Sequence, residues 1–308
     1  MKPMKMPGLP ASAMDEDTAR SFLQGLRWPD GPICPHCGSV SAYALTAKEG
    51  STKPVRKGVY KCKDCRKQFT VTVGTIFEGS HIPIHKWLMG LHLLCASKKG
   101  MSAHQLHRLL GISYKSAWFM AHRIREAMRQ ESPWNKLSGV VEVDETYIGG
   151  KQRAHEELAK PKTPVVALVE RQGRVIAHPL KRVTTDELRK TIRRHVSKKA
   201  LLMTDENPAY QRIGWEDLQG KHLTVNHSKK VYAWGPVSTN AVEGFFSLLK
   251  RGIIGTFHHV SKQHLARYCD EFTFRYNHRQ VTDTERTAAL IKATEGKRLL
   301  YRKPKMSH

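Results

Sequence analysis

The stretch of sequence that decides the fold is Gly139-Val-Val-Glu-Val-Asp-Glu-Thr-Tyr-Ile148. Apolar and polar side chains alternate along it, as in a β-strand with one polar and one apolar face. Asp144 falls on the same face as Glu142 and Thr146, and the two valines that flank Glu142 point to the opposite face. Two glycines follow and end the predicted strand.

The segments around this stretch predict an α/β sheet. Residues 164–170 and 174–179 have strand patterns and are joined by a Gln-Gly pair, a favourable hairpin turn. A helical segment follows, and then the short apolar run 200–203, which is typical of a buried central strand. Asp205 comes two residues after that run, so the predicted sheet carries Asp144 and Asp205 on two of its strands.

A third acidic residue, Glu243, lies in a predicted helix that begins at Thr239 or Asn240. The apolar side chains of this helix lie on one side, and Glu243 and Lys250, two turns apart, lie on the other. Three carboxylates from separate elements can hold two Mg²⁺ ions, since Mg²⁺ prefers oxygen ligands. Such a pair of ions activates a water or a 3′-hydroxyl and stabilises the leaving oxygen of a phosphodiester.

Each acid also has a purely structural explanation. Asp144 can be solvated together with its neighbours Glu142 and Glu145. Asp205 can begin the Asn-Pro turn that follows it, and Glu243 can be the N3 partner of a helix cap. We favour the metal site because all three acids fall on suitable elements of a chain with 27 acidic residues against 52 basic ones.

Four of the six cysteines form two pairs, Cys34-Pro-His-Cys37 and Cys62-Lys-Asp-Cys65, in the pattern C-x2-C-x24-C-x2-C. Two such pairs can supply the four thiolate ligands of one tetrahedral, structural Zn²⁺. Strand-like residues at 55–61 and 68–73 surround the second pair, so the pattern predicts a zinc ribbon. The alternatives are two incidental pairs or a redox pair.

Three predicted helices follow the ribbon. Apolar residues recur with a helical period at 83–97, at 103–110 and from 114 to about 129, and a short turn with Gly111 separates the last two. This is the outline of a helix-turn-helix, with a plain three-helix bundle as the alternative. We expect the exposed side of the third helix to contact DNA through Lys115, Trp118, His122, Arg123 and Arg125.

The composition limits the class of protein. The chain has 308 residues and a formal net charge of +25, which favours nucleic acid as a partner. Its apolar runs are too short to span a membrane, no apolar segment of a signal peptide follows the N-terminus, and six cysteines are too few for a disulfide scaffold. We therefore expect a soluble cytoplasmic protein that binds double-stranded DNA.

Several segments together resemble the IS1595-family (ISXO2-like) bacterial transposases. The most specific is Thr239-Asn-Ala-Val-Glu-Gly-Phe-Phe-Ser-Leu-Leu-Lys-Arg-Gly252. The resemblance covers roughly residues 20 to 280, and its other parts are the cysteine pairs and the segments 69–77, 142–151, 255–260 and 274–277.

This resemblance implies a ribonuclease-H-like catalytic domain and a DDE-type mechanism. The two aspartates of that motif fall on Asp144 and Asp205, the third acid falls on Glu243, and the trailing basic residue falls on Lys250. The implied reaction is Mg²⁺-dependent cleavage at the 3′ ends of an insertion sequence, followed by strand transfer to target DNA. The implied partners are the terminal inverted repeats, recognised by the ribbon and the helical segment, and further copies of the chain.

Further DNA contacts are expected near the third acid. Arg251 follows Lys250 on the same helix, and His227, Lys229 and Lys230 form a basic loop before that helix. We expect the loop to lie along the DNA, and a solvated charge run is the alternative. Such a protein would associate with the bacterial nucleoid.

The predicted domain order is a tail, a zinc ribbon, a helical DNA-binding segment, the α/β catalytic domain and a basic tail, at residues 1–19, 20–78, 79–135, 136–282 and 283–308. Two other functions remain open. One is a ribonuclease-H-like nuclease that cuts without joining. The other is a non-catalytic regulator that binds DNA through the ribbon and the helices.

Overall fold

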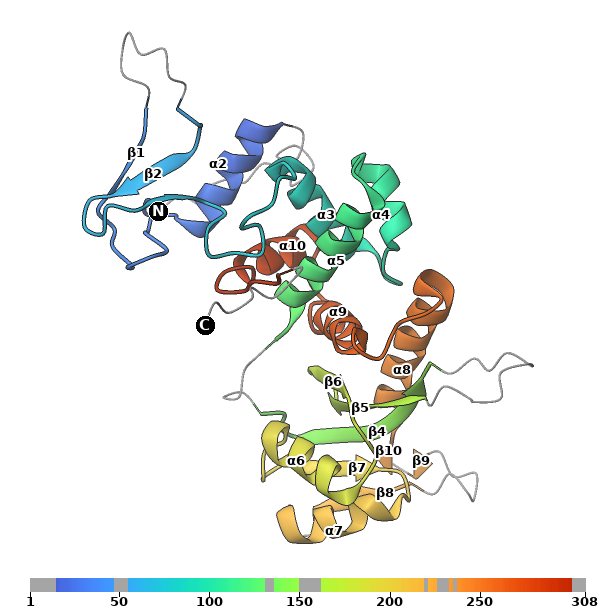
Figure 1. The fold of residues 1–308 in the computed structure, drawn as a ribbon. Helices are drawn as coiled ribbons and strands as arrows, with labels where there is room; N and C mark the ends of the chain where they lie inside the picture. Colours follow the sequence, from blue (N-terminus) through green and yellow to red (C-terminus); the bar gives the residue numbers. More distant parts are fainter. Residues whose placement is uncertain are drawn as a thin grey trace, which may run out of the picture. The chain divides into compact units, whose positions relative to one another are not determined.

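A computed structural model describes residues 15–46, 55–130, 136–149, 162–218, 221–225, 233–234 and 237–300. The chain forms two compact units (Figure 1). Met1–Met128 and Val281–His308 belong to the first unit, and Arg129–Gln280 form the second. Described residues 281–300, most of which the predicted domain order assigns to a basic tail, lie in the first unit together with the N-terminal part of the chain.

The first unit begins with a helix and a small sheet. Its elements are α2 (Glu16–Arg27), β1 (Ala42–Ala44), β2 (Val59–Cys62), β3 (Gln68–Thr70), α3 (Ile84–Ala96), α4 (Ala103–Leu110), α5 (Tyr114–Met128) and α10 (Asp283–Lys292). The three strands pair antiparallel in the order β1-β2-β3. β2 begins four residues later than the sequence predicts and β3 ends three residues earlier, because residues 57–58 and 71–74 form turns.

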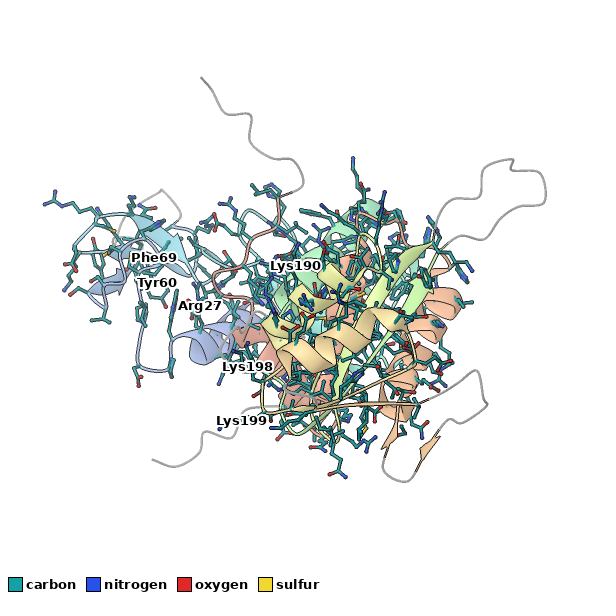
Figure 2. The ribbon with its side chains drawn as sticks, turned by 90° about the horizontal axis from the view of Figure 1, so that it is seen from below. Arg27, Tyr60, Phe69, Lys190, Lys198 and Lys199 are labelled. Atoms are coloured by element: carbon teal, nitrogen blue, oxygen red, sulfur yellow. The ribbon has the colours of Figure 1, made fainter. Side chains whose placement is uncertain are left out.

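Three aromatic rings form the small core of the ribbon. Trp28 packs edge-on against Tyr60 and Phe69, with ring centroids 5.6 and 5.7 Å away, and the latter two rings stack on each other at 5.8 Å (Figure 2). The Arg27 guanidinium lies over the Trp28 ring and donates a 2.7 Å hydrogen bond to the carbonyl oxygen of Val71. Such a small sheet has little apolar surface to bury, so these rings supply a large part of its core.

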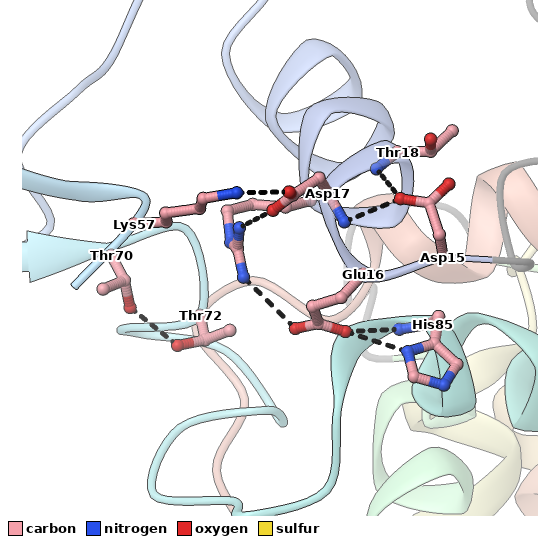
Figure 3. Close-up of polar contacts among 9 residues, drawn as sticks. Asp15, Glu16, Asp17, Thr18, Lys57, Thr70, Thr72 and His85 are labelled. Atoms are coloured by element: carbon pink, nitrogen blue, oxygen red, sulfur yellow. Dashed lines mark hydrogen bonds and ion pairs between the residues drawn. The ribbon is translucent and has the colours of Figure 1, made fainter.

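Helix α2, which the sequence analysis missed, connects the ribbon to the helical segment (Figure 3). Asp15 caps its N-terminus by accepting hydrogen bonds from backbone amides two and three residues further on. In its first turn Asp17 pairs with Lys57 of the ribbon at 2.7 Å, and Glu16 accepts bonds from the backbone and the ring of His85, at 3.2 and 3.0 Å. The capping aspartate followed by two acids was the available sequence signal.

The three helices α3, α4 and α5 confirm the predicted helical segment. Ser102 caps α4 by accepting from the Gln105 amide at 3.2 Å, and α4 ends at Gly111, whose φ of +56° lies in the left-handed region that favours glycine. α10 packs against α2 and α3, where Arg286 donates to the Cys95 carbonyl oxygen at 2.9 Å.

The second unit is an α/β domain with a mixed five-stranded sheet. Its elements are β4 (Val140–Ile148), β5 (Thr163–Glu170), β6 (Val175–Pro179), α6 (Thr185–His195), β7 (Leu201–Thr204), α7 (Pro208–Asp217), β8 (His222–Thr224), β9 (Ala233–Trp234), β10 (Val237–Ser238), α8 (Asn240–Gly252), the π-helix η2 (Ile253–Phe257) and α9 (Leu265–Asn277). The strand order is β6-β5-β4-β7-β8, with β4 antiparallel to β5 and parallel to β7. This confirms the predicted α/β class.

Helices cover both faces of this sheet (Figure 1). α8 and α9 pack on one face, and α6 and α7 pack on the other. The register pairs Glu142 with Val169 and Asp144 with Ala167, which places both acids on the α8 face, whereas Glu145 pairs with Val166 and lies on the α7 face. Within the described residues, no helix is both long enough and apolar enough to cross a membrane.

Candidate functional site

The four paired cysteines meet at one point in the ribbon. The sulfur atoms of Cys34 and Cys65 are 3.6 Å apart, those of Cys37 and Cys62 are 3.7 Å apart, and all four lie within 4.8 Å of one another. A tetrahedral Zn²⁺ with bonds of about 2.3 Å separates its sulfur ligands by about 3.8 Å. The cysteines therefore fit one structural Zn²⁺, as predicted.

Replacing Cys62 by serine should release the zinc, because three cysteines no longer complete the tetrahedral set. We expect one zinc per chain in the unaltered protein and less than about half of that in Cys62→Ser, measured by elemental analysis. Cys95→Ser alters a buried cysteine outside the cluster and is the control. Equal zinc content in both variants would contradict the assignment.

The second candidate site gathers the three predicted acids in the α/β unit. Asp144 lies in the middle of β4, Asp205 directly follows β7, and Glu243 lies in the first turn of α8. Because β7 runs parallel to β4 with Met203 opposite Glu142, Asp205 lies level with Asp144. Burial, the neighbouring charge of Glu145 and the charges of Asp205 and Glu243 raise the pKa of Asp144 to about 7.

The carboxylate oxygens of these three acids do not lie as close together as the sulfur atoms of the four cysteines. Among the described residues, only the cysteine cluster brings three or more potential ligand atoms within 4.8 Å of one another. Asp205 accepts from the Asn207 amide at 3.1 Å, which agrees with the turn considered from sequence. Glu243 is the fourth residue of α8, after the N-cap Thr239, and accepts from the hydroxyl of that residue at 2.9 Å, so it does not hold the N3 position considered from sequence. Asp144 and Asp205 are half-buried and Glu243 is exposed. Carboxylates gathered in this way nonetheless fit divalent cations, which remove the repulsion between their charges.

Glu142 is buried and Glu145 is half-buried, whereas the alternative considered from sequence was that both are solvated together with Asp144. Glu142 is only 1% exposed and accepts bonds from the backbone amides of Ala241 and Val242, at 2.7 and 3.2 Å. Its other oxygen accepts from the Arg171 Nε at 2.9 Å. Glu142 therefore connects β4 to the start of α8.

Glu145 makes a corresponding connection on the opposite face of β4. It accepts a 2.7 Å bond from the Asn207 side chain and another bond from the Tyr210 hydroxyl. Burial raises the pKa of Glu145 and, more strongly, that of Tyr210. Sequence reasoning missed Arg171, Asn207 and Tyr210, because no local pattern indicates which distant carboxylate a side chain will meet.

The basic residues expected near the third acid lie in the last turn of α8. Lys250 and Arg251 are both exposed, and Arg251 donates to the Ser247 carbonyl oxygen at 3.1 Å. Lys250 lies two turns after Glu243 on the same helix. The predicted loop contacts, His227, Lys229 and Lys230, lie outside the described residues.

The prediction that five side chains of α5 form an exposed, DNA-contacting face is only partly correct. Lys115 is exposed and Trp118 is half-buried, but His122, Arg123 and Arg125 are buried. The prediction that these three side chains are exposed was therefore wrong.

The contacts of two of these residues show why they are buried. The Arg123 guanidinium donates to the carbonyl oxygens of Glu78 and Leu299, at 2.7 and 3.1 Å, and lies over the Phe119 ring. The His122 ring packs against Trp118. Arg123 thus connects α5 to the segments before α3 and after α10, which a helical pattern cannot reveal.

Replacing Arg123 by methionine should lower the stability of the first unit by about 1–3 kcal/mol, because two buried carbonyl oxygens lose their donor. Lys115→Met, on the exposed side of the same helix, should change stability by less than about 0.5 kcal/mol. Urea unfolding of both variants measures the difference. An Arg123→Met variant of unchanged stability and weakened DNA binding would contradict the structural role.

Comparison with known proteins finds a related domain in each of the two units. Residues 14–68 match the model of a transposase zinc-ribbon domain, and residues 136–277 match that of the ISXO2-like transposase domain. The chain is also 27% identical over 279 residues to an uncharacterized protein in transposable element ISH50 of Halobacterium salinarum, an alignment that covers 85% of this chain and 91% of that protein.

A zinc-ribbon domain followed by a transposase domain places the chain in the class of insertion-sequence transposases. The chain is a member of the ISXO2-like (IS1595) transposase family.

Proposed function

We propose that the chain cleaves the 3′ ends of an insertion sequence and joins them to target DNA by a DDE mechanism. Asp144, Asp205 and Glu243 are the proposed metal ligands. The observation that carries this proposal is the position of these acids on three elements of one domain: Asp144 lies in β4, Asp205 follows β7 level with it, and Glu243 lies in the first turn of α8. The mixed sheet with helices on both faces supports a ribonuclease-H-like fold.

The three carboxylates would hold Mg²⁺, which prefers oxygen ligands of this kind. When bound, a pair of these ions activates the attacking oxygen and stabilises the leaving oxygen of the phosphodiester. The position of Asp144 on a central strand fixes its carboxylate. Lys250, exposed on the helix that carries Glu243, is suited to contact a phosphate of the cleaved strand.

Exposed basic residues in both units support a role for DNA in this reaction. In the first unit, the exposed Lys115 on α5, together with the half-buried ring of Trp118, would contact the terminal inverted repeats, and the zinc ribbon would add to that surface. In the second unit, Arg251 continues the basic end of α8. Because both ends of an element are joined to one target, we expect the chain to act as a multimer on DNA.

Strand joining tests this function directly. The full-length protein is mixed with Mg²⁺, a supercoiled plasmid and labelled duplexes from the DNA flanking its gene. We expect the label to enter the plasmid with the unaltered protein. Asp205→Asn should abolish joining and keep or strengthen DNA binding, because it removes a negative charge near the phosphate.

The matched control is Asp186→Asn, which alters an exposed aspartate in the first turn of α6. It should join DNA at the rate of the unaltered protein. Cleaved ends without joining would identify a nuclease instead. DNA binding without any Mg²⁺-dependent reaction would favour a regulator and contradict the proposal.

A further inference from the structure

Helix α8, which carries Glu243, is capped by a residue from a distant strand. The first amides of a helix have no partner within the helix, and usually the side chain of the preceding residue accepts their hydrogen bonds. Thr239 holds that position, but its side chain caps no amide and its hydroxyl donates to Glu243. The amides of Ala241 and Val242 are bonded instead by Glu142, about a hundred residues earlier.

The charge of Glu142 suits this capping role. A carboxylate at a helix N-terminus interacts favourably with the positive end of the helix dipole. Arg171 lies 2.8 Å from the other oxygen of Glu142 and donates to the hydroxyl and carbonyl oxygens of Ser238, at 2.9 and 3.3 Å. Ser238 ends β10, immediately before α8. This pair, of buried Glu142 and half-buried Arg171, therefore attaches both the start of α8 and the strand before it to β4.

On the opposite face of β4, Glu145 holds the turn that carries Asp205. Its oxygens accept from the side chains of Asn207 and Tyr210 at the start of α7. The backbone amide of Asn207 donates in turn to Asp205. Glu145 thus constrains Asp205 through Asn207, as Glu142 constrains Glu243 through α8.

We propose that Glu142 and Glu145 are positioning residues that set the other two acids against Asp144. The proposal rests on the function proposed above. Both glutamates use both carboxylate oxygens in contacts with the acid-bearing elements or with Arg171, so they organise the metal site without being its ligands. Side chains alternate along a strand, so one short segment of β4 can reach elements on both faces.

The test measures the affinity for Mn²⁺, by electron paramagnetic resonance of the free ion, in the full-length protein. Zinc is kept bound, and no DNA is added. We expect Glu142→Gln and Glu145→Gln to weaken Mn²⁺ binding by roughly 10- to 100-fold, as is usual for residues that orient metal ligands. Asp144→Asn should remove the binding altogether, which shows that the signal reports the proposed site.

Glu271→Gln is the control for a purely structural effect. Glu271 is also fully buried and pairs with an arginine, but the partner, Arg275, belongs to the same helix α9. Loss of this carboxylate should lower stability and leave Mn²⁺ affinity unchanged. If Glu142→Gln does not fold, Glu142→Gln/Arg171→Gln removes both charges, so that the guanidinium is not left without its carboxylate partner. The folded double variant should still bind Mn²⁺ weakly.

A second readout is the Mg²⁺ concentration at half-maximal strand joining. It should rise in both positioning variants, and Mn²⁺ should restore part of their activity because it binds oxygen ligands more tightly than Mg²⁺. Unaltered Mn²⁺ affinity in Glu142→Gln and Glu145→Gln, with binding lost in Asp144→Asn, would overturn this inference alone. Binding that persists in Asp144→Asn would overturn the proposed function as well.

Discussion

The bonding of Glu142 between a helix N-terminus and Arg171 is the interaction on which the α/β unit depends most. A buried carboxylate is tolerated only when it is paired and hydrogen-bonded. Here those requirements are met by backbone amides of α8 and by a guanidinium that also bonds to Ser238. One charge therefore links strands β4 and β10 and helix α8, and the location of Glu243 follows from it.

The need of a buried carboxylate for hydrogen-bond donors also distinguishes the three acids of β4 from one another. β4 carries Glu142, Asp144 and Glu145 within four residues, and the sheet buries or half-buries all three. Two of these carboxylates have several hydrogen-bond donors each, whereas Asp144 accepts from one backbone amide and has a pKa raised to about 7. The carboxylate with the fewest donors is the one best suited to a cation.

Part of this arrangement could be predicted from the sequence because it depends on local patterns. Strand alternation placed Glu142 and Asp144 on one face, and the cysteine spacing indicated a cluster that the structure confirms. The buried state of Arg123 could not be predicted, because it depends on carbonyl oxygens 45 and 176 residues away. Arg171 was missed for the same reason.

Two helices that were missed did have local signals. Asp15 followed by acids marks the start of α2, and Asn207-Pro208 marks the start of α7. The packing of the C-terminal helix α10 on α2 and α3 could not be predicted in this way, because it joins segments that are far apart in the sequence.

A crystal structure of the full-length protein soaked with Mn²⁺ tests the central claim most directly, because anomalous scattering locates the ion. The account predicts Mn²⁺ bound by Asp144, Asp205 and Glu243, with Glu142 still bonded to the first amides of α8. Mn²⁺ bound by Glu142 or Glu145, or no Mn²⁺ beside Asp144, would contradict it.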